Sequence, residues 1–318
     1  MLSRRGFLTG MAATGMAGSL RCSGSAGTTL SITPVRFGVP KRACDCHVHV
    51  FDPGRFPFAA SRTYTPESAT AAQLLAMHRA LHISRVVIVQ PSVYGTDNSC
   101  LLDGMKQYGS EARGIAVLPI EISSATLDNM ERAGIRGVRI NLGTAANTNL
   151  DDARRHLKSA IEQIQDRKWY VQIYAALPVI AGLSDLILAS PVPVVLDHFG
   201  GAKAALGLQQ PGFDKLLELI RSGKGYVKIS GAYRASDKPP DYPDLVSLAG
   251  ALIEANPHRI LWGSDWPHPD TGAGRKPSDL SPLLRVDDAH LLNLLATWAL
   301  DAALRKTILV DNPATLYR

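Results

Sequence analysis

Two histidines spaced two residues apart offer the clearest chemistry in this chain. His47 and His49 lie in the short apolar run 43–50. Side chains alternate along a β-strand, so both imidazoles would project to one side and Cys46 to the other. Two imidazoles that share a space can bind a metal or move a proton, although a buried strand can also hold histidines that only pack. The pair therefore needs partners from elsewhere in the chain.

Two later apolar runs end in ionisable residues that can serve as partners. His198 ends the run 192–198, and Asp265 follows the run 260–264. Gly or Pro comes shortly after each, which is typical of the end of a strand. A carboxylate that faces three imidazoles can activate water, support an oxyanion and return a proton. These are steps of general acid–base catalysis.

A fold that brings strand ends together is needed to position these residues. Eight short β-branched runs predict strands, and they alternate with segments of helical periodicity. Strict alternation gives right-handed βαβ units, and eight units close an α/β fold of the TIM-type (β/α)8 barrel class, whose active groups lie at the carboxyl ends of the strands. The predicted strands are 43–50, 85–90, 114–119, 137–141, 170–174, 192–198, 225–230 and 260–263. The predicted helices are 66–82, 98–109, 124–133, 151–167, 178–189, 213–223, 242–255, 287–300 and 301–310.

Composition and charge support a single globular enzyme. The chain has 318 residues, of which 46% are hydrophobic and 19% charged. The net charge is +6, but three arginines lie in residues 1–26, which hold no acid. The remaining charge is weak support for nucleic-acid binding. We expect a leader at 1–26, an extended arm at 27–42 and one barrel domain at 43–318 with extra C-terminal helices.

The leader resembles a twin-arginine export signal. Arg4 and Arg5 precede a Gly/Ala-rich apolar run at 7–20, and small residues favour cleavage after Ala26. We therefore expect the twin-arginine export machinery to carry the folded protein to the periplasm, with no stable membrane span. The rest of the chain keeps three cysteines, and this odd number predicts no disulfide framework.

Residues 41–318 resemble the amidohydrolase superfamily. The resemblance is carried by the H-x-H of residues 47–49, the histidine of D-H-F-G at 197–200 and the aspartate of G-S-D-W-P-H-P at 263–269. More narrowly, the chain is similar to the 2-pyrone-4,6-dicarboxylate lactonase group, whose members hydrolyse lactones and some of which isomerise sugar lactones. The D-W-P-H-P ending, the run 134–141 and Q-P-S at 90–92 carry this narrower match.

The resemblance implies a role for each matching residue. Asp265 would be the general base for water, while the three histidines, His47, His49 and His198, would polarise or hydrogen-bond the ester carbonyl. The residues that would hold the substrate and its carboxylate are Tyr64, Ser92, Arg139, Tyr174 and Arg234.

Two positions depart from the lactonase pattern. Ala145 stands where the group has an additional arginine, and Asp270, beside the substrate, stands where it has an asparagine. Losing a cation and gaining an anion disfavours a dicarboxylate, because a buried carboxylate without a partner is costly. We therefore expect a sugar-acid lactone or another monocarboxylated lactone.

The resemblance also bears on cofactors. Members with two metals use a carboxylated lysine on the fourth strand, and members with one metal usually use a histidine on the fifth. Arg139 and Tyr174 stand there instead. We therefore expect no required metal, although His47, His49 and Asp265 can hold a single Zn²⁺, which lowers the pKa of bound water to about 7.

Several alternatives stay open. The chain could be a metal-dependent decarboxylase of the aminocarboxymuconate type, a sugar-lactone isomerase, or a barrel that binds a small acid without turnover. Cys46 is expected to be a packed thiol, and Lys203 is a weaker candidate for the barrel mouth. His78 and His82 lie four residues apart on a predicted helix and are expected at the surface.

Overall fold

The strands form a nearly closed barrel. A computed structural model describes residues 33–144, 149–271 and 274–318. Its eight parallel strands pair in the order β1-β3-β4-β5-β6-β7-β8-β9. The amide of Asp265 donates to the His47 carbonyl at 2.9 Å and the amide of His49 to the Trp266 carbonyl at 2.8 Å, which joins the last strand to the first. The predicted TIM-type barrel is therefore confirmed.

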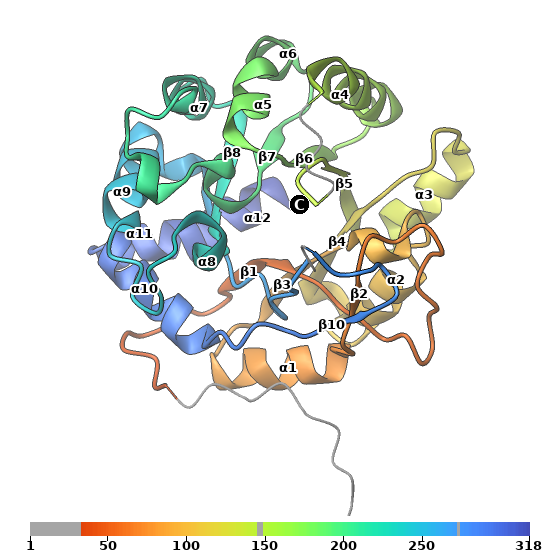
Figure 1. Cartoon of the computed structure of the whole chain (residues 1–318), viewed down its shortest axis with the longest axis horizontal. Helices are drawn as coiled ribbons and strands as arrows, with labels where there is room; N and C mark the ends of the chain where they lie inside the picture. The colour runs from red at the N-terminus through yellow and green to blue at the C-terminus, as the bar shows by residue number, and fades with distance from the viewer. Residues whose placement is uncertain (1–32, 145–148, 272–273) are drawn as a thin grey trace, which may run out of the picture.

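The strands form an inner ring, and the helices surround it (Figure 1). The barrel strands are β1 Cys44–Val48, β3 Arg85–Val89, β4 Ala112–Ala116, β5 Ile135–Asn141, β6 Tyr170–Tyr174, β7 Val194–Leu196, β8 Gly225–Ser230 and β9 Ile260–Gly263. The helices are α1 Ala71–Ala80, α2 Ser99–Lys106, α3 Ser124–Arg132, α4 Leu150–Ile164, α5 Leu177–Gly182, α6 Ser184–Ala189, α7 Phe213–Arg221, α8 Ala232–Ala235, α9 Leu245–Ala255, α10 Asp288–Trp298, α11 Ala302–Lys306 and α12 Asn312–Leu316.

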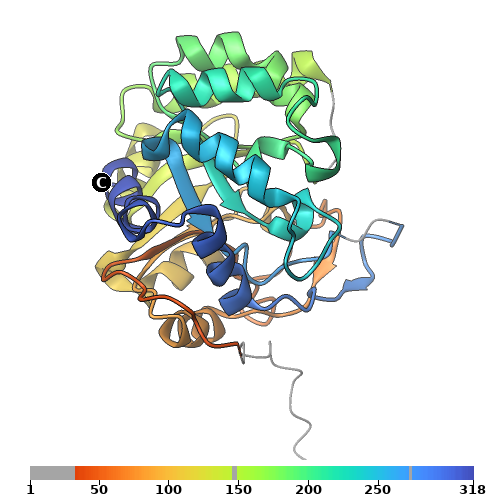
Figure 2. The ribbon, with the colours of Figure 1, turned by 90° about the vertical axis from the view of Figure 1, so that its left-hand side faces the viewer.

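Apolar side chains fill two separate cores. The larger core packs the outer faces of the strands against the helices. The smaller core lies inside the barrel and takes side chains from most of its strands, among them Cys46, Val195 and Tyr226. Arg113, near the start of β4, donates to the Tyr317 carbonyl, so the C-terminus lies at the amino ends of the strands (Figure 2). The pocket lies at the opposite end of the barrel, at the carboxyl ends of the strands.

Several predicted bounds differ in the structure, and one short strand was not predicted. The strand predicted at 114–119 is β4 and ends at Ala116, because the Val117 amide and carbonyl pair with the Asn98 side chain instead of with the sheet. The helix predicted at 66–82 begins at Ala71, where Thr70 and Gln73 form a capping box. Thr65–Pro66 forms the short strand β2, which pairs with β10 Leu280–Ser281 at the barrel mouth.

Parts of the predicted organisation lie outside the described residues. The leader at 1–26 and Ala145 are among them. Of the arm, residues 33–42 are described, and Pro34 and Arg36 hydrogen-bond through their backbone to the Asn293 side chain on α10. Within the described ranges, the helices are too short or too polar to cross a membrane.

Candidate active site

His47 lies in β1 and His49 directly follows it; His49 lines the pocket, whereas His47 is fully buried and does not line it. His47 and His49 lie on the same side, as predicted, and their Nε2 atoms are 3.3 Å apart. Cys46 was expected on the opposite side, but it packs inside the barrel as well. The reason is an irregularity in the β1–β3 pairing between Asp45 and Val48, which breaks strict alternation. The expectation of a packed thiol at Cys46 is confirmed.

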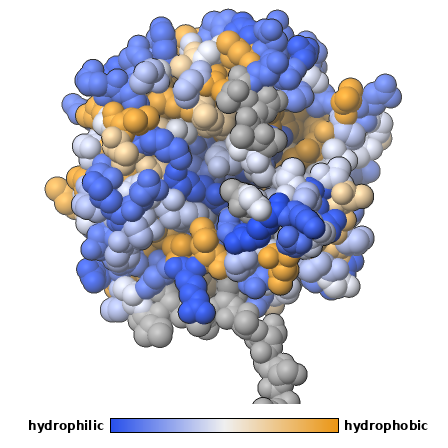
Figure 3. Space-filling view, in the orientation of Figure 1, coloured by the Kyte–Doolittle hydropathy of each residue, from blue (hydrophilic) through white to orange (hydrophobic). Residues whose placement is uncertain are grey.

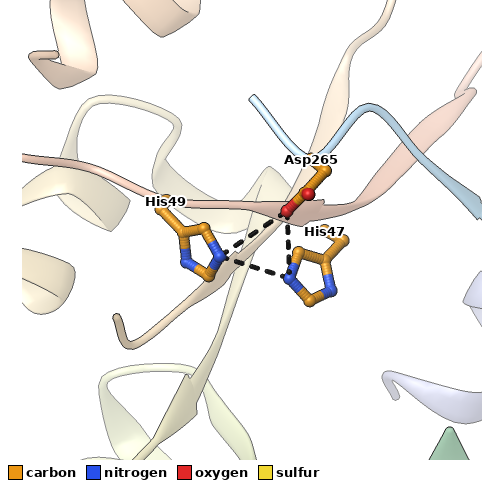
Figure 4. A group of neighbouring side chains, drawn as sticks. All are labelled: His47, His49 and Asp265. Atoms are coloured by element: carbon orange, nitrogen blue, oxygen red, sulfur yellow. Dashed lines mark hydrogen bonds and ion pairs between the residues drawn. The ribbon is translucent and has the colours of Figure 1, made fainter. Parts of the chain in front are cut away.

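Asp265 faces the three imidazoles through one oxygen. Its Oδ1 lies 3.6 Å from His47 Nε2, 3.7 Å from His49 Nε2 and 3.9 Å from His198 Nε2. Figure 4 shows Asp265, His47 and His49 pointing toward one another. Within the described chain this oxygen accepts no hydrogen bond. The arrangement leaves a buried acceptor available to a water molecule.

The other oxygen of Asp265 is held by two donors. The Tyr233 hydroxyl and Arg234 Nε, both on α8, each donate to Oδ2 at 2.6 Å. Burial alone would raise the pKa of Asp265, but the Arg234 guanidinium holds this pKa well below its usual range. Asp265 therefore stays ionised, and its carboxylate is fixed in orientation. Its φ of +65° is a left-handed conformation, a form of strain often found at functional sites.

The histidines are oriented by the atoms behind them. His49 Nδ1 donates to the Val89 carbonyl at 2.8 Å, which leaves its Nε2 bare. His198 Nδ1 lies 2.9 Å from the Ser230 hydroxyl. Burial lowers the pKa of His198 to about 3 and the pKa of His49 well below its usual value. Both rings are neutral at physiological pH.

A polar layer that the sequence did not reveal lies beneath His47. Lys228 donates to the Gln172 side-chain oxygen at 2.6 Å, and Gln172 Nε2 donates to Asp197 Oδ2 at 3.0 Å. All three side chains are fully buried. The alternation of side chains along β8 could have revealed Lys228. It lies on the same face of the strand as Tyr226 and Ser230, and both faces of this strand are buried.

The predicted substrate-binding residues converge on the same pocket. Tyr64, Ser92, Tyr174, Arg139 and Arg234 all line it, together with His49, His198, Asp265, Asn141, Thr144, Pro269 and Thr271. Figure 3 views this face of the molecule, where hydrophilic side chains surround a hollow near the centre. Burial raises the pKa of Tyr64 to about 12, so its hydroxyl stays protonated and can donate.

The two pocket arginines differ in how their donors are used. Arg139 donates through Nη1 to the Gln90 carbonyl at 3.0 Å, while its buried Nε has no hydrogen-bond partner among the described residues. Arg234 uses Nε for Asp265 and Nη2 for the Pro269 carbonyl. Arg139 therefore has a donor available for a bound anion, whereas Arg234 is largely committed to the protein.

The remaining candidates lie outside the pocket lining. Asp270 pairs with Arg275 at 2.6 Å. Lys203 Nζ bonds to the Arg234 carbonyl. His82 is exposed as expected.

His78 was expected at the surface and is fully buried. Its Nε2 lies 3.2 Å from Asp45 Oδ2, and its Nδ1 lies 2.9 Å from the Tyr108 hydroxyl. The prediction was wrong because His78 lies on the face of α1 that packs against β1.

Comparison with known proteins decides the family. A family model described as amidohydrolase matches residues 44–318. The chain belongs to the amidohydrolase family. This confirms the resemblance that the two histidines and the D-W-P-H-P ending indicated.

Several relatives of this amidohydrolase are hydrolases of lactones by name. The chain is 36% identical over 286 residues to a 4-sulfomuconolactone hydrolase of Rhizobium radiobacter, covering 89% of this chain and 92% of the relative. It is also 36% identical over 294 residues to a 2-pyrone-4,6-dicarboxylate hydrolase of Comamonas testosteroni, with the same coverage of both chains. A crystal structure of a putative 2-pyrone-4,6-dicarboxylic acid hydrolase from Pseudomonas putida has a TM-score of 0.72 and 33% identity. The match covers 87% of this chain and 98% of that one.

Three side chains of this amidohydrolase could together hold a metal ion. His47, His49 and Asp265 each offer a ligand atom, and these atoms lie within 4.8 Å of one another. His49 Nε2 is bare and Asp265 Oδ1 is available, so both fit a cation. His47 fits less well: Lys228 Nζ and Asp197 Oδ1 both lie 3.2 Å from its Nδ1, but only the Lys228 contact has hydrogen-bond geometry, and that contact favours a proton on Nε2. The distances allow a single ion, but the hydrogen bonding at His47 opposes one.

Proposed function

We propose that this protein hydrolyses a carboxylated lactone, with Asp265 as the general base. The observation that carries the proposal is the unpaired Oδ1 of a buried, ionised aspartate that faces three imidazoles. A water molecule bound at Oδ1 would lie between the base and the ring nitrogens, within the reach that proton transfer needs. The names of the relatives support the same reaction class.

The reaction proceeds in two steps. Asp265 takes a proton from water as the water oxygen bonds to the lactone carbonyl carbon. His198 Nε2 can donate to the resulting oxyanion when the Ser230 hydroxyl donates to its Nδ1, and neutral donors in a buried site stabilise such charge strongly. The ring C–O bond then breaks, and protonated Asp265 returns its proton to the leaving oxygen. The product is a ring-opened acid, and the base is regenerated.

Arg139 is proposed to bind the carboxylate of the substrate. Its Nε is a buried donor without a partner among the residues that the structure describes, and such a donor costs about 1–3 kcal/mol until an acceptor arrives. Because Arg234 is held by Asp265, Arg139 Nε is the buried guanidinium donor left for a substrate carboxylate among the described lining residues, while Arg139 Nη2 lies 3.8 Å from Asp197 Oδ2. This favours a lactone with a single carboxylate, such as a sugar-acid lactone, over a dicarboxylate.

The proposed reaction requires no metal. Asp265 is ionised without one, and the hydrogen bonding at His47 opposes the ligand set. If Zn²⁺ were bound by His47, His49 and Asp265, it would supply a water of lowered pKa.

A lactone panel tests the proposed function. We expect acid release from lactones that carry one carboxylate, less from dicarboxylates and little from uncharged lactones. Arg139→Met should raise KM for the carboxylated substrate about 10- to 100-fold and leave uncharged lactones unaffected. Arg136→Met is the matched control, because Arg136 bonds to the Arg318 carbonyl away from the pocket.

The same panel separates the alternatives. Release of carbon dioxide would indicate a decarboxylase, and conversion to a second lactone without acid would indicate an isomerase. Saturable binding without any product would indicate a barrel that only binds small acids. Any of these three results would reject hydrolysis.

We also propose export to the periplasm through the twin-arginine machinery. Arg4, Arg5 and the following apolar run support it. Cell fractionation should find the processed chain outside the cytoplasm. Replacing both arginines by lysine should keep it inside, and unchanged export of that variant would reject the proposal.

A further inference from the structure

Lys228 is a buried amine that the proposed chemistry does not use. It is fully buried on β8 and does not line the pocket, although charged side chains in such positions are costly unless they are paired. Its Nζ reaches three groups: the Gln172 side-chain oxygen at 2.6 Å, His47 Nδ1 at 3.2 Å and Asp197 Oδ1 at 3.4 Å. The contact with His47 links Lys228 to the catalytic site.

The surroundings of His47 Nδ1 decide where the ring proton lies. Lys228 Nζ, a donor, and Asp197 Oδ1, an acceptor, both lie 3.2 Å from this nitrogen. The Lys228 contact has hydrogen-bond geometry, whereas Asp197 Oδ1 accepts no hydrogen bond from any described residue. With Lys228 as the donor, Nδ1 is the acceptor, and a neutral imidazole then carries its proton on Nε2; with Asp197 as the acceptor, the proton would lie on Nδ1.

The hydrogen bonds continue from His47 to His49 with the same donor-to-acceptor direction. His49 Nδ1 donates to the Val89 carbonyl, so His49 Nε2 is bare. His47 Nε2 lies 3.3 Å from it and can donate to it. The hydrogen bonds thus run one way, from Lys228 through His47 and His49 to the backbone of β3.

We propose that Lys228 is a positioning residue that fixes His47 in its Nε2–H tautomer and thereby keeps metal ions out of the His47–His49–Asp265 group. A metal would need the lone pair of His47 Nε2, and in this tautomer that position holds a proton. Without Lys228, the His47 proton can move to Nδ1 and bond to Asp197, which frees Nε2 as a ligand. A carboxylate behind a histidine is the arrangement that commonly supports metal-bound imidazole.

The catalytic consequence rests on the proposed function, but the proton position and the metal preference do not. Both can be measured without substrate. If the protein has the expected tautomer but hydrolyses no lactone, the proposed function is rejected and this inference is retained.

The first test is the tautomer in the unaltered protein. The chain is labelled with ¹⁵N-histidine, and His47 is assigned by comparison with His47→Gln. Two-bond and three-bond proton–nitrogen correlations distinguish a protonated ring nitrogen from a bare one. We expect His47 Nε2 to be protonated and Nδ1 bare. A protonated Nδ1 would overturn the proposal.

The second test is zinc affinity in the absence of substrate. Lys228→Met should move the His47 proton to Nδ1 and bind zinc about 10- to 100-fold more tightly than the unaltered protein. The matched control is Lys224→Met, because Lys224 is exposed just before β8 and bonds to the Ser190 carbonyl. Equal zinc affinity in all three proteins would overturn the proposal. If Lys228→Met does not fold, Lys228→Gln keeps a polar group for Asp197, and the tautomer measurement decides the question without either variant.

Discussion

Two buried aspartates, Asp45 and Asp265, stand beside histidines at the junction of β1 and β9, and their surroundings differ. Asp45 Oδ1 accepts the backbone amides of His47 at 3.1 Å and Ser264 at 3.0 Å, and its Oδ2 bonds to His78. Asp265 has one oxygen filled by two donors and one oxygen without any described donor. Both carboxylates are fully buried. Burial therefore does not separate the two sites, whereas hydrogen-bond saturation does.

Hydrogen-bond saturation separates a structural carboxylate from the proposed general base. Asp45 is saturated and joins the strand that carries His47 to the loop that carries Asp265. Asp265 keeps an unsatisfied acceptor at the pocket, a costly arrangement that stability alone would not favour. We expect substitutions at Asp265 to cost turnover and substitutions at Asp45 to cost stability.

The largest expected effect is the loss of turnover in Asp265→Asn. The amide cannot take a proton from water, so kcat should fall by about 10²- to 10⁴-fold. Asparagine tolerates the positive φ at this position, so the fold should be retained. The measurements are kcat on the best lactone of the panel and urea unfolding of the same sample. Near-normal turnover would reject Asp265 as the general base and, with it, the proposed difference from Asp45.

Asp45→Ala should show the opposite pattern. It leaves two buried amides and His78 without their acceptor, so the free energy of unfolding should fall by about 3–5 kcal/mol. Asp45→Asn keeps an oxygen for the two amides and should recover most of that loss. Urea unfolding of both variants checks this. A negligible loss in Asp45→Ala would show that saturation does not identify the structural carboxylate.

Tyr233→Phe sharpens the comparison on the catalytic side. It removes one of the two donors that orient Asp265 Oδ2, so kcat should fall about 10-fold, the equivalent of one hydrogen bond. KM should change little, because Tyr233 does not line the pocket. Tyr108→Phe removes the matching hydroxyl behind His78 and should leave kcat unchanged. A fall in kcat of equal size in Tyr108→Phe would contradict the account.

The smallest expected effect is on acid stability. The folded-state pKa of His198 is about 3, because burial lowers it, whereas an unfolded histidine titrates near 6.5. Between these values the unfolded chain binds a proton that the fold does not, so stability is full above pH 6.5 and is lost as pH falls. This one residue contributes up to about 1.4 kcal/mol per pH unit. His198→Asn should flatten the dependence by that amount between pH 6 and 5, measured by urea unfolding. An unchanged slope would contradict the assignment of a buried neutral ring.

The sequence was sufficient for the barrel and for the four groups at its mouth. Alternating β-branched and amphipathic segments indicated the fold, and each of the four groups ends a strand whose place in the order determines where it points. These features are local, which is why they could be predicted from the chain alone.

The residues that support the site could not be predicted in the same way. Lys228 and Gln172 could not be recognised because both lie on strands that are buried on both faces. Their hydrogen-bond partners come from other strands across the barrel and not from neighbours in the sequence. His78 was misplaced because helical periodicity does not say which face of α1 packs inward. Cys46 was turned the wrong way because the irregularity in β1 depends on its pairing with β3. Each of these errors comes from a tertiary contact.

Metal-free catalysis by Asp265 can be tested through the turnover of metal-stripped protein. The enzyme is dialysed against a chelator, its metal content is measured, and kcat is compared before and after, with and without added zinc. An ionised carboxylate base predicts that kcat stays the same as the metal content approaches zero. A loss of activity that zinc restores would contradict the account.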